Sequence, residues 1–296
     1  MIEKRFLSLL LFITTISLSA QVKGIVKDNV TGKPIPFVNI WVENENIGTT
    51  TEENGTFSLD IKEEKVLVFS ALGYDTKTIK SSNDFTFFLT KKPLQLNENV
   101  VENKKEEKKL KVGKYSNSKI KSFYGGGIRP KIFAKKIESN NEISEHPFLK
   151  EISFISLSEI ENAKINLRFF KINPNGKPGD DILVENLIVE VKIGRNNNVV
   201  NIEKYNIKIP EEGLFIAFEW MIIDKNKFYY TNNNDSNTPL LNEKLYQPLL
   251  GFFYSEEQLI WEFKKGDWFI KEEERSKSKN NKKKYGELDI QLTLTN

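Results

Sequence analysis

The chain has 296 residues, of which 39% are hydrophobic and 11% aromatic, which is enough for a buried core and excludes a chain that is disordered throughout. Lys and Arg number 44 against 41 Asp and Glu, so a net charge of +3 gives no reason to expect a nucleic-acid partner. The chain has no Cys, which excludes disulfides, thiolate metal sites and cysteine nucleophiles. The length favours two domains.

The first twenty residues have the order of a secretory signal peptide. Lys4 and Arg5 precede an apolar run from Phe6 to Leu18, and the small residues Ser19 and Ala20 follow. The run is shorter than the ~20 residues that a transmembrane helix needs. We therefore expect residues 1–20 to be removed. The mature chain is expected to be exported, without a transmembrane helix, to the periplasm, the outer membrane or the cell surface. An uncleaved N-terminal anchor is the alternative.

Residues 21–92 predict short strands separated by turns. Apolar and polar residues alternate in several short runs, and Asn54-Gly55 is a strong hairpin signal. In one of these runs Val38, Ile40 and Val42 share one face, while Phe37, Asn39 and Trp41 share the other. Several such strands at close spacing predict an antiparallel β-sandwich.

The motifs "GIVKD", "TGKPI", "GTTTEENGTF" and "GY" of this segment resemble those of carboxypeptidase-regulatory-like domains. The matching residues are Gly24, Val26, Asp28, Thr31, Gly32, Pro34, Ile35, Gly48, Thr49, Thr51, Gly55, Phe57, Gly73 and Tyr74, and Glu52 stands where the family often has Asp. The resemblance implies a transthyretin-like, immunoglobulin-like β-sandwich without catalytic residues. Related domains precede TonB-dependent outer-membrane transporters. The metallopeptidase that names the family is not expected, because the chain has one His.

Residues 93–119 are charged with both signs and predict a linker. Residues 120–296 predict a second β-sandwich, because strand patterns recur along them and residues 286–294 alternate. The run "GLFIAFEWMIID" is apolar on both faces, which predicts a central strand. Residues 165–220 loosely resemble exported jelly-roll domains, which implies no activity. The expected fold class is all-β, a transthyretin/Ig-like sandwich followed by a jelly-roll-like sandwich.

Aromatic residues in the second domain are candidates for a glycan site. Trp220, Trp261 and Trp268 lie in predicted strands, and an exposed indole face can stack on a sugar ring. The alternative is that these rings belong to the core, as most do in a sandwich of this size.

The loop "NPNGKPGDD" is a candidate calcium site. Asn173, Asn175, Asp180 and Asp181 supply the oxygen ligands that calcium prefers, although their spacing differs from that of an EF-hand. The alternative is a polar hairpin connection, for which Asn, Gly and Pro are equally suited. No other cofactor is expected.

The sequence gives little support for an enzyme. His146 is the only histidine and no nucleophile elbow accompanies it, so a Ser-His-Asp triad is not expected. A glycoside hydrolase needs only two carboxylates, and Glu219 and Glu262, each beside a Trp, are candidates. The alternative is that both face solvent or pair with a cation.

The sequence therefore predicts an exported, non-enzymatic protein of the cell envelope. The first hypothesis is an accessory binding or adhesion module that meets an envelope glycan or a surface protein of the outer membrane. The alternatives are a structural partner of a TonB-dependent outer-membrane transporter, or a hydrolase with a carboxylate pair in the second domain.

Overall fold

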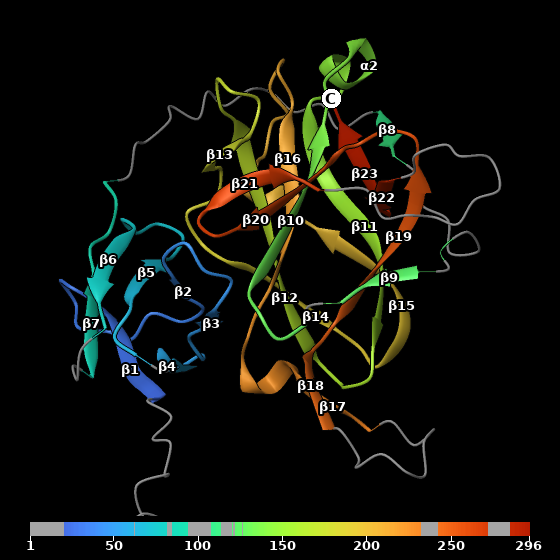
Figure 1. Cartoon of the computed structure of the whole chain (residues 1–296). Helices are drawn as coiled ribbons and strands as arrows, with labels where there is room; N and C mark the ends of the chain where they lie inside the picture. Colours follow the sequence, from blue (N-terminus) through green and yellow to red (C-terminus); the bar gives the residue numbers. More distant parts are fainter. Residues whose placement is uncertain are drawn as a thin grey trace, which may run out of the picture.

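The structure is a computed structural model that describes residues 21–61, 63–81, 85–93, 108–113, 120, 122–125, 127–231, 242–271 and 285–296. Within these ranges nearly all regular structure is strand, which confirms the all-β prediction (Figure 1). The helical segments are α2 (Asn141–Glu145) and the short 3₁₀ turns η1 (Glu203–Tyr205) and η2 (Asp224–Asn226). The predicted signal peptide lies outside the described residues.

The first domain is a sandwich of two small sheets. One sheet has the order β4-β1-β7 and the other β3-β2-β5-β6. Apolar side chains from both sheets fill the space between them, among them Val38, Ile40 and Phe57. The strands are β1 (Gln21–Asp28), β2 (Asn39–Val42), β3 (Gly48–Thr50), β4 (Thr56–Asp60), β5 (Val66–Ser70), β6 (Lys77–Lys80) and β7 (Thr86–Leu89).

The turn after β1 is held by Asp28, a buried residue of the resemblance motif. Its Oδ1 accepts the backbone N–H groups of Val30 (3.0 Å) and Thr31 (2.7 Å), and its Oδ2 accepts the hydroxyl of Tyr74 (3.1 Å). Gly32 in this turn has a φ of +67°, a conformation that glycine adopts without a Cβ penalty. These bonds, led by that of the Thr31 N–H, lower the pKa of Asp28 to about 2.

The second domain consists of two facing seven-stranded sheets and the hairpin β17-β18. The first sheet contains β10 (Lys131–Ile137), β12 (Ala163–Ile172), β13 (Pro178–Asp181), β14 (Leu187–Val191), β16 (Leu214–Trp220), β20 (Ile260–Lys264) and β21 (Asp267–Ile270). The second contains β8 (Lys109–Val112), β9 (Ser122–Tyr124), β11 (Phe148–Ser158), β15 (Gly194–Asn201), β19 (Leu249–Ser255), β22 (Tyr285–Leu288) and β23 (Ile290–Thr295). The hairpin strands are β17 (Lys227–Thr231) and β18 (Asn242–Tyr246).

The central strands of this domain's first sheet, β10, β12 and β16, are largely buried on both faces. The inner face of this sheet packs on the second sheet through a large apolar core that includes Leu167, Phe218 and Trp220. β16 lies between β12 and β10 and every one of its residues is buried, which confirms the prediction of a central strand. We call the opposite face, which carries Asn166, Glu219 and their cross-strand neighbours, the outer face.

The boundary between the domains differs from the predicted linker of residues 93–119. Strand β8 (Lys109–Val112) lies within that span and pairs with β23 at the edge of the second sheet. Leu110 and Val112 pack against the core while the two lysines between and before them are exposed. This alternation covers only four residues in a charged segment, so composition concealed it. Among the described residues, no helix is long and apolar enough to cross a membrane.

Candidate binding site between the two domains

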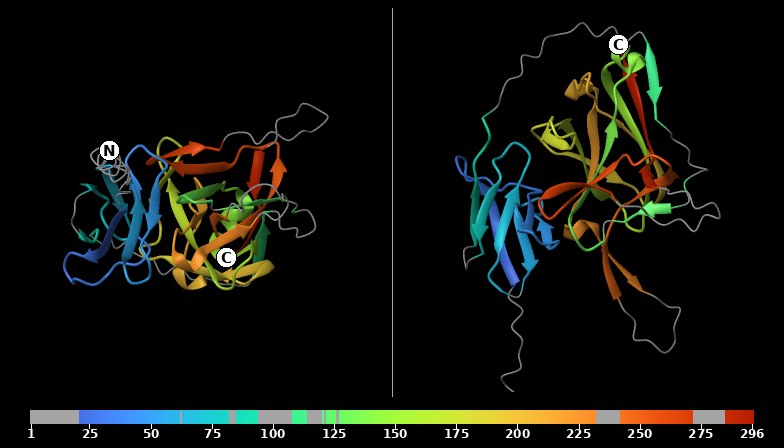
Figure 2. Two further views of the ribbon diagram at one scale, coloured as in Figure 1. Left: turned by 60° about the horizontal axis from the view of Figure 1, so that its bottom comes forward. Right: turned by 45° about the horizontal axis from the view of Figure 1, so that its top comes forward.

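The first domain lies against the outer face of the second domain's first sheet (Figures 1 and 2). The face of β2 that carries Asn39 and Trp41 is the contacting face, because Val38, Ile40 and Val42 point into the first domain's own core. The Trp41 ring meets the Phe263 ring edge-on at 5.7 Å between centroids. The alternation seen in the sequence therefore separates one strand into a core face and an interdomain face.

A loop of the first domain forms a second group of contacts with the segment that follows β16. The Thr50 hydroxyl accepts the backbone N–H of Ile222 (3.1 Å), and the Glu52 carboxylate accepts that of Asp224 (2.8 Å). Lys164 of β12 forms an ion pair with Glu53. Burial raises the pKa of Glu52, and the hydrogen bond from Asp224 opposes that change. Backbone donors thus fix the relative position of the domains.

A buried polar cluster joins the outer face to the first domain. Arg168 donates to both carboxylate oxygens of Asp181 (2.9 and 2.6 Å) and to Oε1 of Glu219 (3.1 Å). Asn166 donates to Oε2 of Glu219 (2.8 Å), and Asn39 of the first domain donates to Oε1. The register aligns Asn166 with Glu219 across neighbouring strands, so their side chains share this face.

Electrostatics explain why this cluster is stable only as a unit. Burial disfavours the charged guanidinium of Arg168, but the attraction of Glu219 and Asp181 outweighs that cost and raises its pKa. Burial raises the pKa of Asp181, and Arg168 acts in the opposite direction. The buried carboxylate of Glu219 and the half-buried one of Asp181 share one guanidinium, so the amides of Asn39 and Asn166 supply the further donors that Glu219 needs.

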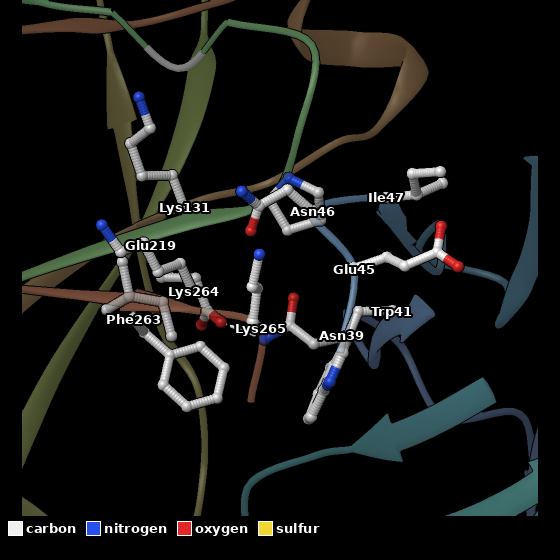
Figure 3. A pocket seen from close by; sticks show the side chains of 12 residues that line it. Asn39, Trp41, Glu45, Asn46, Ile47, Lys131, Glu219, Phe263, Lys264 and Lys265 are labelled. Atoms are coloured by element: carbon white, nitrogen blue, oxygen red, sulfur yellow. Dashed lines mark hydrogen bonds between the residues drawn. The ribbon is translucent and has the colours of Figure 1, made fainter. Parts of the chain in front are cut away.

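A pocket opens beside this cluster at the domain boundary. The first domain contributes Asn39, Trp41, Glu45, Asn46 and Ile47, and the second contributes Pro130, Lys131, Ile132, Glu219, Phe263, Lys264 and Lys265. Figure 3 shows Asn39, Lys265 and Asn46 grouped at its centre, with Trp41 and Phe263 on either side. Its volume is about 40 Å³. A water molecule needs roughly 10–15 Å³ of such space, so the pocket accommodates a small chemical group and not a whole sugar ring.

The three tryptophans predicted as a glycan platform lie elsewhere and are largely packed. Trp220 is fully buried in the inner core, where its indole N–H donates to the Pro248 carbonyl (2.7 Å). Trp268 is buried against Phe170. Trp261 is half-buried and contacts Phe215 at 6.2 Å between ring centroids. The prediction of stacking surfaces at Trp220 and Trp268 is wrong, because the core filled by the apolar strands includes these rings.

The predicted calcium ligands serve other contacts. Oδ1 of Asn173 accepts the backbone N–H groups of Asn175 and Lys177, both at 3.0 Å, and so closes the hairpin. Asp181 belongs to the Arg168 cluster, and Asp180 is exposed. These contacts engage two of the four candidate ligands and agree with the alternative of a polar hairpin connection, while the calcium site stays a prediction. Within the described ranges no group of three or more His, Asp or Glu side chains is placed to hold a metal ion.

The carboxylates proposed for a hydrolase point away from each other. Glu219 is in register with Ile132 and Phe263 on the outer face. Glu262 precedes Phe263 on β20 and is in register with Phe133, so it projects from the inner side of the sheet. The two carboxylates are therefore separated by the sheet. His146 ends α2, and its Nδ1 lies 3.0 Å from the Glu142 carbonyl oxygen.

Sequence reasoning missed the residues that build this site. Asn39 and Trp41 were predicted only to share one face of a strand, and Arg168 was not singled out. One sequence feature did point to the site. The segment that forms β16 is apolar on both faces except for one acid, Glu219. Such an acid requires a cation and donors nearby, yet the sequence does not say which residues supply them.

Comparisons with known proteins bear on the first domain. Residues 22–101 match the CarboxypepD_reg-like domain family. Over 58 residues, 20% of this chain, the sequence is 40% identical to the TonB-dependent receptor SusC of Bacteroides thetaiotaomicron. The match spans 6% of the length of that receptor.

Two solved structures align with most of the chain at low similarity. The cysteine protease and lectin-like domains of Cwp84, a surface layer associated protein of Clostridium difficile, cover 84% of this chain and 45% of theirs, at 10% identity and a TM-score of 0.31. The structure of the infectious bursal disease virus Gx strain aligns with 93% of this chain and with 58% of its own chain, at 9% identity and a TM-score of 0.25. Scores this low establish no common fold. The family match, together with the motifs and the seven-stranded sandwich, identifies the N-terminal domain as a CarboxypepD_reg-like domain.

Proposed function

We propose that this chain is an exported, non-catalytic protein of the cell envelope, in which the two domains together form one binding module. The observation that carries the proposal is the pocket at their boundary, whose walls come from both domains. Hydrogen bonds from Asn39 to Glu219 and from Ile222 to Thr50 hold these walls in place. A site that is preformed in this way binds without the cost of ordering its own groups.

The envelope location is supported by two independent features of the sequence. Residues 1–20 have the order of a signal peptide. The first domain is similar to a segment of SusC, a TonB-dependent receptor. The ligand we favour is therefore one that the envelope presents, a glycan or a surface protein that inserts a small group into the pocket.

The non-catalytic part of the proposal is supported by the state of the carboxylates. Glu219, the buried acid beside the pocket, already accepts from Arg168, Asn166 and Asn39. An acid whose oxygens are all engaged is poorly placed to exchange a proton with a substrate. The other candidate, Glu262, lies on the opposite face of the sheet.

A thermal-shift screen of the full chain against envelope glycans, calcium and small organic acids tests the binding site. The variant Ile47→Trp fills the mouth of the pocket, and Val199→Trp is its matched control, because Val199 is 62% exposed on β15. We expect a ligand to raise the melting temperature of the wild type and of Val199→Trp with concentration, but not that of Ile47→Trp. Equal shifts in all three would place the site elsewhere and contradict the proposal.

A second candidate function is a structural partner of a TonB-dependent receptor, which the 40% identity to SusC favours. Co-purification of the tagged full chain from envelope extracts tests it, with the mature N-terminus read by mass spectrometry. Recovery of such a receptor with a chain cleaved near Ala20 would support it. Recovery in the soluble cell fraction with residues 1–20 intact would contradict both candidates.

A further inference from the structure

Strand β15 is the longest described strand that has a neighbour on one side only. It pairs with β11 from Gly194 to Asn201, and these eight residues have no second partner strand among the described residues. Every other described strand with a single neighbour has three to five residues. Figure 1 shows β15 at the side of the second domain that faces away from the first domain, so the first domain does not cover it.

The backbone of β15 presents a row of hydrogen-bonding groups along its outer edge. The N–H of Ile202, the residue after the strand, donates to the Lys150 carbonyl of β11 (2.9 Å), and an antiparallel ladder repeats this pattern at every second residue. The even-numbered residues of β15 therefore bond to β11, and the odd-numbered ones direct their N–H and C=O groups away from it. For Asn197, Val199 and Asn201 these outward groups have no partner within the described ranges.

This edge lacks the features that normally keep a strand from pairing with another chain, which are lysine, proline and bulges. Other edge strands have them, since β6 and β8 each carry two lysines and β13 begins with Pro178. β15 has the sequence "GRNNNVVN", without lysine or proline, and its register with β11 is unbroken. Its apolar residue Val199 is 62% exposed. A long, regular and unprotected edge of this kind is a template for a further strand.

A second copy of β15 fits this edge in the antiparallel orientation. About a two-fold axis at Val199, odd-numbered residues of the two copies lie opposite each other, so their outward backbone groups can pair. Val199 then packs on Val199 of the second copy, and Asn197 lies opposite Asn201. An axis at Asn197 or Asn198 would instead place the valine opposite Arg195 or an asparagine. Arg195 is the only charged residue of the strand and lies away from the axis, so no like charges meet.

We propose that two copies of the chain form a dimer by joining their second sheets through antiparallel β15 strands. Because both copies use the same edge, the association stops at two chains. This dimer forms independently of the pocket between the domains. A single strand pair is a small interface, so we expect a weak dimer with a dissociation constant of roughly 10–100 µM. Well below that concentration the chain is a monomer, in which substitutions at Asn197 and Val199 change only exposed side chains.

Sedimentation equilibrium of the full chain, at concentrations from about 5 to 500 µM, tests this dimer. We expect the average mass to rise with concentration from that of one chain towards that of two. Val199→Lys and Val199→Glu each place like charges at the axis and should weaken dimerisation at least about fivefold. An equimolar mixture of the two variants places opposite charges there and should restore the dimer. The control is Val30→Lys, which should leave the dimer unchanged, because Val30 is 84% exposed in the first domain.

Thermal melting at low concentration shows that each variant is folded, since an unchanged melting temperature is expected for all of them. A monomer at every concentration would overturn the dimer. A dimer that Val199→Lys leaves intact would overturn it as well, because association through any other surface, residues 1–20 included, does not depend on Val199. If both charged variants weaken the dimer and their mixture does not restore it, the two-fold pairing at Val199 is overturned. The thermal-shift screen of the pocket is read on the monomer, so failure of the dimer and failure of the proposed function are distinguishable.

Discussion

The two faces of the β12-β16-β10 sheet are both buried, but they are buried by different means. The inner face is covered by the chain's own second sheet through apolar side chains such as Leu167, Phe218 and Trp220. The outer face carries a smaller apolar cluster, which includes Phe215 and Trp268, and beside it the polar group of Asn166, Arg168 and Glu219, which the first domain covers in part. An apolar face gains from any well-packed cover, whereas charges gain only from correctly placed partners. This difference indicates that apolar burial on the inner face drives the folding of the second domain. The polar groups of the outer face determine how the two domains are positioned relative to each other.

Removing Arg168, the cation of the outer face, should lower the free energy of unfolding more than the other changes described below. Arg168→Met leaves the buried Glu219 and the half-buried Asp181 without their guanidinium, and we expect a loss of about 3–5 kcal/mol in the free energy of unfolding. The matched inner-face change, Leu167→Met, conserves volume and should cost less than about 1.5 kcal/mol because apolar packing adapts. Urea unfolding of the full chain measures both. A smaller loss for Arg168→Met than for Leu167→Met would show that the two faces do not differ in this way.

Removing the contact of the first domain with the buried polar cluster should lower the stability by an intermediate amount. Asn39→Ala removes the donor to Glu219, and a hydrogen bond to a charged group contributes about 1.5–3 kcal/mol. We expect calorimetry to show a lower melting temperature, with the unfolding of the two domains separating. The control is Asn197→Ala, an exposed residue of β15. If both variants melt alike, Asn39 makes no contribution to the joining of the domains.

The smallest effect is expected within the first domain, as a loss of stability when the pH falls. The folded-state pKa of Asp28 is about 2, below its ordinary value of 3.8, so its carboxylate stabilises the fold at neutral pH. This stabilisation is complete above about pH 4 and is lost as the pH falls towards 2. Asp28→Asn should flatten this part of the stability profile, measured by denaturant unfolding with NMR signals of the first domain. A profile as steep as that of the wild type would assign the acid sensitivity to other groups.

The sequence predicted what depends on local pattern and missed what depends on distant partners. Alternation grouped Val38, Ile40 and Val42 on one face of a strand, which proves to be the buried face, and the apolar run of β16 identified it as central. The same alternation could not identify what covers Asn39. The contact between Asn39 and Glu219 joins residues far apart in the chain.

The errors in the predicted sites have a common physical origin. Trp220 and Trp268 were candidates for a glycan surface because of their chemistry, but the alternative holds, since their side chains are buried. Asp181 was assigned to a metal by its neighbours in sequence, although its partner is Arg168 on the adjacent strand. In both cases the residue type allowed two roles, and only the three-dimensional neighbours decide between them.

The most direct test of the account is hydrogen exchange at two backbone amides of the second domain whose acceptors belong to the first. Ile222 N–H donates to the Thr50 hydroxyl and Asp224 N–H to the Glu52 carboxylate, while Asn226 N–H donates within its own domain to Ile223. If the two domains form one preformed unit, both interdomain amides are protected in the full chain at least as well as that of Asn226. Exchange of Ile222 and Asp224 at the rate of an open chain, with Asn226 still protected, would contradict the central claim.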